Sequence, residues 1–273
     1  MDNTVKEPLI HLSKREDMSF GKKWLVRIIA ILLSLIVCAG FIFIIIKMNP
    51  VEVYEGIVAG AVGTGRRFWV TARDALTLLC VAVAVTPAFK MKFWNIGAEG
   101  QILMGCVASA AMMIYAGNAL PTGLLLVLMF VCSFIAGGIW GIIPAFFKAR
   151  WNTNETLFTL MLNYVAMQVV TFCIVYWENP AGSNSVGIIN APTRAGWLPQ
   201  LFGLDYGWNL AIVLLLTVLM FIYMKRTKHG YEIAVVGESE NTARYAGINV
   251  GKVIVRTVGI SGGIAGIAGF ILV

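Results

Sequence analysis

The sequence has little charge. Only 13% of its 273 residues are Asp, Glu, Lys or Arg, whereas 59% are hydrophobic, and the mean hydropathy is +0.81. An ordinary soluble domain carries about 25% charged residues, so a soluble fold of this composition would have almost nothing to solvate its surface. The composition therefore excludes an ordinary soluble enzyme, a disordered chain and a secreted disulfide scaffold, and it indicates an integral membrane protein.

The sequence also lacks any grouping of residues that builds a metal or catalytic site. Its five cysteines lie inside apolar runs with no CxxC spacing, and its two histidines, His11 and His229, lie in separate charged segments where we expect them to be solvated. Zinc and redox sites need clustered ligands, so the thiols are interpreted as packing groups. There is no HExxH sequence and no pair of catalytic carboxylates. We expect no metal, no cofactor and no enzymatic activity in this chain.

Long uncharged stretches predict seven transmembrane helices. A helix needs ~20 apolar residues to cross ~30 Å of hydrocarbon, so the long stretch 100–147 must hold two spans, with a turn at 116–122. The shorter stretch 75–89 contains Pro87 and is interpreted as a distorted span. The other spans are expected at 28–46, 156–177, 206–224 and 257–273. The predicted fold class is all-α, a polytopic membrane helical bundle.

The distribution of basic residues predicts the orientation of the chain. With a cytoplasmic N-terminus, the cytoplasmic segments 1–27, 90–97, 148–154 and 225–256 hold 16 of the 21 Lys and Arg residues. This excess follows the positive-inside rule, and it explains the net charge of +7 without nucleic-acid binding. We therefore expect a cytoplasmic tail at 1–27, a transmembrane domain at 28–273, and an external loop at 178–205 that meets an external partner.

The cytoplasmic loop 225–256 contains the signal of a short helix. Ser239 suits the N-cap, Glu240 lies in the first turn, Arg244 follows four residues later, and Gly247 suits the position after the C-cap. These residues predict a helix over 240–246. It is either a solvated connector or a docking element for a cytoplasmic protein.

A polar segment interrupts the apolar stretches near residue 95. It combines amides, a carboxylate and aromatic rings around the glycines at 97 and 100: Phe93, Trp94, Asn95, Glu99 and Gln101. Polar side chains at membrane depth are tolerated only where they face protein or a water-filled cavity. The segment is either an ordinary turn, with Glu99 favoured by the helix dipole, or part of a pathway for an uncharged polar solute.

A second polar group leads into the span at 156–177. Thr153 or Asn154 suits its N-cap, and Glu155 lies in its first turn. Asn163, about two turns further on, is either an interhelical hydrogen-bonding group or a pathway group.

Glycines recur four residues apart in the last span, at Gly259 with Gly263 and at Gly262 with Gly266, and also at Gly137 with Gly141. This spacing is typical of close helix–helix packing in membranes. The run 247–252 resembles a phosphate-binding loop but lacks one spacer residue and precedes a span, where no strand is available. Any energy for active transport must therefore come from another subunit.

Four motifs occur in a fixed order along residues 70–273: Asn95-Ile-Gly-Ala-Glu-Gly-Gln101, Asn154-Glu155 followed by Thr159-Leu-Met-Leu-Asn-Tyr164, Ala243-Arg-Tyr-Ala-Gly-Ile248, and Ser261-Gly-Gly-Ile-Ala-Gly-Ile-Ala-Gly269. Together they resemble the permease subunits of bacterial ABC importers of the ribose/branched-chain amino acid type. The branch that works with basic membrane lipoproteins on nucleosides or simple sugars is the most similar. The family often has Asn and Pro where this chain has Ser239 and Glu240, and Ala where it has Thr242. Family members continue with further spans, so we expect this chain to be truncated at its C-terminus.

The resemblance implies a permease that passes a nucleoside or simple sugar into the cell while a partner subunit binds and hydrolyses ATP. It assigns ATPase coupling to the cytoplasmic helix and its flanks: Ser239, Glu240, Asn241, Thr242, Ala243, Arg244, Tyr245, Ala246 and Gly247. The candidate pathway residues are Phe93, Trp94, Asn95, Glu99, Gln101 and Asn163. The expected partners are a cytoplasmic ABC ATPase, a second permease subunit, an extracytoplasmic substrate-binding lipoprotein and the bilayer of the bacterial cell membrane.

The alternative function is a secondary transporter of a small polar solute. Ion coupling would need titratable groups inside the membrane, whereas only Glu99, Arg73 and Asp74 lie near spans, each close to an end.

Overall fold

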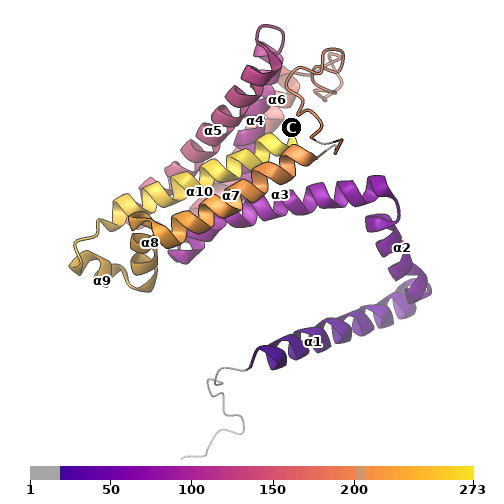
Figure 1. Ribbon diagram of the computed structural model, residues 1–273, viewed down its shortest axis with the longest axis horizontal. Coiled ribbons are helices and arrows are strands. Elements are labelled where there is room, and N and C mark those ends of the chain that lie inside the picture. The colour runs from indigo at the N-terminus through magenta and orange to yellow at the C-terminus, as the bar shows by residue number, and fades with distance from the viewer. Residues whose placement is uncertain (1–18, 202, 205) are drawn as a thin grey trace, which may run out of the picture. The chain divides into compact units, whose positions relative to one another are not determined.

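The computed structural model describes residues 19–201, 203–204 and 206–273, and helices dominate this part of the chain (Figure 1). Contacts divide the chain into two compact units, residues 1–67 and 68–273. The prediction for His11, and most of the predicted tail, lie outside the described residues. The first described helix begins at Phe20, inside the segment predicted as tail.

The helices of the first unit that the structure describes contain no buried residue. Helix α1 (Phe20–Phe41) continues into the π-helical segment η1 (Ile42–Ile46), and α2 (Pro50–Val62) follows. A helix that is apolar all round and unburied within its own unit suits a lipid environment. The α2 helix was not predicted, although its start carries clear signals. Pro50 is its first residue, and the Asn49 side chain accepts a hydrogen bond from the Val51 N–H at 3.1 Å.

Six long helices lie wholly or almost wholly in the described part of the second unit: α3 (Gly65–Lys90), α4 (Ala98–Ala116), α5 (Thr122–Trp151), α6 (Glu155–Tyr176), α7 (Gly207–Arg226) and α10 (Val250–Leu272). Two short helices, α8 (Lys228–Glu238) and α9 (Glu240–Tyr245), connect α7 to α10. With Phe20–Ile46, seven helices in the described chain are long and apolar enough to cross a membrane. This confirms the predicted helical bundle with seven spans.

The boundaries of α3 differ most from the prediction. The helix begins at Gly65, ten residues before the predicted start at residue 75, and includes Arg73 and Asp74. The Arg73 guanidinium Nη2 lies 2.9 Å from Asp74 Oδ1, so the two charges satisfy each other at the helix surface. The predicted span starts too late because counting uncharged residues treats every charged residue as a boundary of the span.

Helix α10 forms the centre of the second unit, and 16 of its 23 residues are buried. It packs against α4 and α5 through backbone rather than large side chains. A Cβ atom built on Gly137 of α5 would lie 2.7 Å from the Cα of Gly266, and one built on Gly266 would overlap the Ser133 carbonyl oxygen. The prediction that these glycines serve close helix packing is therefore confirmed.

Serine hydroxyl groups join α4 to α5 beside the glycine contact with α10. The Ser109 and Ser133 hydroxyl oxygens lie 2.6 Å apart, and Ser133 Oγ donates to the Gly105 carbonyl oxygen at 3.0 Å. Lipid provides no hydrophobic driving force between helices, so tight van der Waals packing and interhelical hydrogen bonds must stabilise the bundle.

The glycine contact can be tested by one added methyl group. Gly266→Ala should lower the thermal midpoint of the purified protein in detergent by roughly 5 °C or more, because overpacking typically costs about 1–3 kcal/mol and a backbone carbonyl cannot move aside. Gly123→Ala is the matched control, since a Cβ there meets nothing within 4 Å. Equal midpoints for the two variants would contradict the packing described.

Candidate functional site

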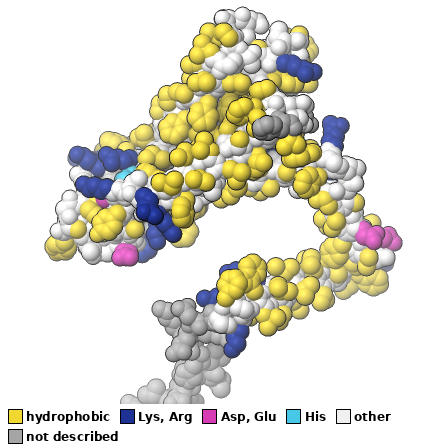
Figure 2. Space-filling model, in the orientation of Figure 1, with side chains coloured by type: hydrophobic (Ala, Val, Ile, Leu, Met, Phe, Trp, Pro, Cys, Tyr) yellow, Lys and Arg dark blue, Asp and Glu magenta, His cyan; other side chains and the backbone are white. Residues whose placement is uncertain are grey.

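One end of the second unit carries α8 and α9 between the ends of the transmembrane helices. Lys and Arg side chains gather at this end (Figure 2). An apolar cluster lies beneath the two short helices and includes Met91, Phe93, Ile233, Ala243 and Val253. The cluster fixes both helices to α10 and to the corner between α3 and α4.

The short helix α9 has the caps that the sequence predicts. The Ser239 Oγ accepts a hydrogen bond from the Thr242 N–H at 3.3 Å, and Arg244 Nη2 lies 3.6 Å from Glu240 Oε2. Gly247 has a φ of +77°, which a residue with a side chain rarely adopts. The Ile248 N–H bonds to the Ala243 carbonyl oxygen at 2.9 Å, closing a Schellman-type end.

The two faces of α9 differ sharply. Ala243 is fully buried in the chain's own apolar cluster, so a substitution there tests the fold as well as any docking. Tyr245 is 93% exposed, and Asn241, Thr242 and Ala246 are exposed beside it. The helix therefore presents a polar face with one projecting aromatic ring.

Two crevices flank α9. One of about 230 Å³ lies toward Met91, Phe93 and Glu155, and the other, of about 400 Å³, lies toward Arg150 and Asn152. Lys148 lines both, and its Nζ lies 2.9 Å from Glu155 Oε2, an ion pair with both side chains mostly buried. This pair joins the end of α5 to the start of α6, where Asn154 is the N-cap and accepts from the Leu157 N–H at 3.1 Å.

His229 joins α8 to two transmembrane helices, which corrects the prediction that it is solvated. The imidazole is buried, with the Tyr223 hydroxyl at Nδ1 and the Thr257 hydroxyl 3.4 Å from Nε2. Burial and the nearby Arg256 guanidinium lower the pKa of His229, and the Glu232 carboxylate opposes this shift only in part. The ring is therefore neutral at neutral pH and links α7, α8 and α10.

The amides of the polar segment near residue 95 turn toward each other. Asn95 Nδ2 donates to Gln101 Oε1 at 3.2 Å, Gln101 Nε2 donates to Asn95 Oδ1 at 3.4 Å, and the Gly97 N–H donates to the same Asn95 oxygen at 3.1 Å. Both side chains are almost completely buried. They close the turn between α3 and α4 and hold the first turn of α4.

Asn163 of α6 completes this polar cluster. Its Oδ1 accepts from the Gly100 N–H at 2.9 Å, and its Nδ2 donates to the Ile96 carbonyl oxygen at 3.0 Å. The interhelical reading of Asn163 is therefore the one that the geometry supports. A Cβ built on Gly100 would lie 2.9 Å from Asn163 Oδ1, so the glycine is needed for this close approach.

The remaining candidate pathway residues lie in different environments. Phe93 is buried in the apolar cluster under α8, whereas Trp94 and Glu99 are exposed. Trp94 contacts the Phe89 ring edge-on, with the ring centroids 5.6 Å apart. Of the six candidate pathway residues, the structure therefore brings only Asn95, Gln101 and Asn163 together in one hydrogen-bonded cluster. Among the described residues, no group of three or more His, Cys, Asp or Glu side chains is placed to hold a metal.

The loop 178–205 is anchored to the opposite end of the bundle. Asn190 Nδ2 donates to the Met113 carbonyl oxygen at 2.8 Å and to the Ala195 carbonyl oxygen at 3.0 Å. A cleft of about 620 Å³ opens beside it, lined by Tyr115, Tyr176 and Trp177 among others. The Trp177 Nε1–H donates to the Tyr115 hydroxyl at 2.8 Å, which holds these two lining side chains together.

The bracing role of the amides leads to a prediction. Asn163→Ala should lower the stability of the protein by about 1–3 kcal/mol, because it leaves the buried Gly100 N–H without a partner and also removes the hydrogen bond to the Ile96 carbonyl oxygen. Uptake of every substrate should fall alike, with the loss tracking the amount of folded protein. Exposed Glu99→Gln is the control and should keep normal stability. Folded Asn163→Ala protein with a changed ranking of substrates would instead assign Asn163 to the pathway.

The sequence matches the protein family described as branched-chain amino acid transport system / permease component over residues 67–273. The matched region begins one residue before the second unit and covers all of it. It contains the polar cluster, α8, α9 and α10.

Several relatives match over most of the chain. The guanosine ABC transporter permease protein NupP of Bacillus subtilis is 31% identical over 252 residues, which cover 90% of this chain and 70% of that protein. The nucleoside ABC transporter permease protein NupB of Lactococcus lactis is 28% identical over 260 residues, which cover 92% of this chain and 70% of that protein. The glucose ABC transporter permease protein TsgB13 of Haloferax volcanii is 27% identical over 253 residues, which cover 87% of this chain and 64% of that protein. No solved structure matches the chain.

Proposed function

The chain belongs to the family of branched-chain amino acid transport system permease components, and on this premise we propose that it passes a nucleoside or simple sugar into the cell as the permease of an ABC importer. Relatives named for guanosine, nucleosides and glucose support this substrate class. The described residues include seven helices that are long and apolar enough to span, so the chain is a multi-pass membrane protein. The observation that carries the proposal is this family match over the whole second unit.

In this proposal, α9 is the contact through which an ATPase subunit drives transport. The ATPase binds and hydrolyses ATP, and the permease itself holds no nucleotide. Tyr245 and the exposed polar residues around it meet the ATPase, while Ala243 transmits the displacement to the apolar cluster beneath. A second permease subunit completes the pore, and a substrate-binding lipoprotein docks on the loop 178–205.

The candidate pathway residues divide into two groups under this proposal. Asn95, Gln101 and Asn163 brace the helices, because their amides are already engaged with protein groups. Trp94 and Glu99 keep exposed surface, so they remain the members of the set that a passing solute can touch. An aromatic face and a carboxylate suit the ring and the hydroxyl groups of an uncharged nucleoside.

The proposed orientation places the N-terminus in the cytoplasm and the loop 178–205 outside. In a variant without the native cysteines, Ser183→Cys should react with a membrane-impermeant thiol reagent added to intact cells, because Ser183 is exposed on that loop. Asn241→Cys, exposed on α9, should react only after permeabilisation. The reverse pattern of labelling would invert the topology.

Coupling through α9 predicts a selective loss of transport. Tyr245→Ala should weaken uptake of radiolabelled nucleoside and substrate-stimulated ATPase activity of the reconstituted complex about tenfold or more, as expected for an aromatic anchor at an interface. The protein should insert at its normal level, because the Tyr245 ring makes little contact with its own chain.

Tyr231→Ala is the control, since this tyrosine is 66% exposed on the neighbouring helix α8. It should keep most of the activity. Normal uptake with Tyr245→Ala, or an equal loss with both variants, would contradict the assignment of coupling to α9. No response of the intact complex to any nucleoside or sugar would contradict the proposed substrate class.

A further inference from the structure

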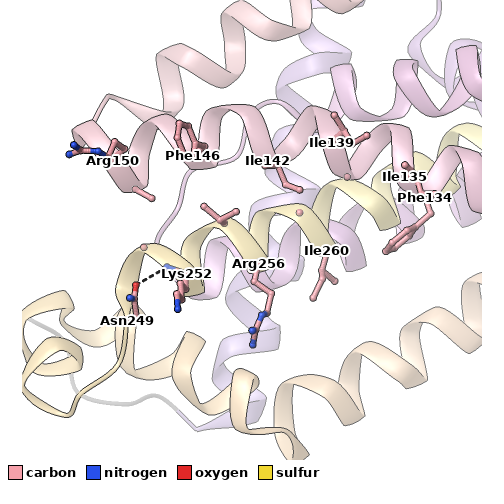
Figure 3. Close-up of a pocket in the computed structure, with 15 residues that line it drawn as sticks. Phe134, Ile135, Ile139, Ile142, Phe146, Arg150, Asn249, Lys252, Arg256 and Ile260 are labelled. Carbon is pink, nitrogen blue, oxygen red and sulfur yellow. Dashed lines mark hydrogen bonds between the residues drawn. The ribbon is translucent and has the colours of Figure 1, made fainter.

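A long open groove runs between α5 and α10 on the surface of the second unit (Figure 3). Its volume is about 770 Å³, and its walls are apolar along most of its length, with Phe134, Ile139, Ile142 and Phe146 on α5 and Ile260 on α10. Glycines at 138, 251 and 259 leave room where side chains would otherwise fill the space. The volume and the apolar lining of the groove suit hydrocarbon chains.

One end of the groove is basic. Arg150 lies in the last turn of α5, and Lys252 and Arg256 lie one turn apart on α10, at the end of the groove away from Phe134 (Figure 3). All three side chains are exposed. Within the described part of the chain, none of the three pairs with a carboxylate. Two carboxylates at this end pair with other cations, Glu155 with Lys148 and Glu240 with Arg244.

Arg256 lies close to the start of a helix that is long and apolar enough to span the membrane. The helix α10 begins at Val250, so Arg256 lies about 9 Å along the helix axis from its start at 1.5 Å per residue. A guanidinium near the edge of the hydrocarbon must reach the interface or meet an anion. In a bilayer, lipid phosphates lie at the edge of the hydrocarbon, next to acyl chains that would enter the apolar part of the groove.

We propose that this groove is a binding site for an anionic phospholipid of the leaflet on the α8–α9 side. The headgroup phosphate lies among Arg150, Lys252 and Arg256, and an acyl chain follows the apolar wall from Phe146 toward Phe134. The proposal depends on the membrane placement of the chain and not on its transport substrate. An uncharged nucleoside or sugar would leave the three cations without counter-charge.

The charges also argue against a second copy of this chain as the occupant. Two copies that met symmetrically through this face would place the same patch on both sides of the contact. Three unpaired cations from each copy would then lie along one interface. An anionic lipid neutralises them instead, and each basic residue near an anionic headgroup adds to the affinity.

Native mass spectrometry of the purified chain in detergent tests the proposal, with dioleoyl phosphatidylglycerol and dioleoyl phosphatidylcholine as probes. The unaltered protein should retain phosphatidylglycerol about tenfold or more tightly than phosphatidylcholine. The combined variant R150Q/K252Q/R256Q should lose this preference. The control K225Q/R226Q/K228Q removes three cations of the same end that do not line the groove, and it should keep the preference.

Two further measurements separate the groove from general surface charge. Ile139→Trp puts a larger side chain on the exposed apolar wall and should weaken phosphatidylglycerol binding without loss of thermal stability. Inorganic phosphate at millimolar concentration should not displace the lipid, since the acyl chain contributes to binding. Equal retention of the two lipids, equal losses in both triple variants, or displacement by phosphate would overturn the proposal. So would a lipid-free dimer that Ile139→Trp dissociates, which would assign the groove to a second copy.

Discussion

The contact of α10 with α4 and α5 through glycine is the constraint on which the rest of the second unit depends. In lipid, helices gain little by burying apolar side chains against each other, so close backbone approach supplies much of the stabilisation. Gly137 and Gly266 permit the approach of α5 to α10, and the Ser133 hydroxyl joins α5 to α4 by donating to the Gly105 carbonyl oxygen. With α10 enclosed in this way, its first turns stand in a defined position at the end of the bundle. The apolar cluster that holds α8 and α9 is built on those turns.

From α9, a continuous series of close contacts leads to the polar cluster. Ala243 packs into the apolar cluster with α8, and the end of α8 meets the corner after α3 so closely that a Cβ on Gly237 would overlap the Lys90 carbonyl oxygen. A few residues later, Asn95 and Gln101 close the turn into α4. Such packing resists gradual deformation, so a displacement of α9 is passed on as movement of whole helices.

Much of the fold follows from counting residues, and the exceptions depend on features that such counting does not consider. The seven spans are visible as apolar stretches, and α9 is visible from Ser239 and Gly247, because both signals are local. The α2 and α8 helices are short and lack a long apolar run, so counting passes over them. The start of α3 was missed because Arg73 is neutralised by its neighbour Asp74, which a rule that ends spans at charges does not consider. Burial of His229 depends on Thr257, 28 residues away, and no local pattern reports such a partner.

Polar residues in a membrane span are therefore weak evidence of a pathway until their partners are known. Asn163 has the residue type and depth of a substrate ligand, yet its carbonyl and its amino group each bond to the backbone around α4. A side chain that is satisfied in this way stabilises the bundle and offers little to a passing solute. Polar surface that is still open lies instead at the two ends, in the cleft by Tyr115 and Trp177 and on the exposed side chains of Trp94 and Glu99. The groove between α5 and α10 is lined instead by apolar side chains with cations at one end, and this lining suits a lipid rather than a polar transported solute.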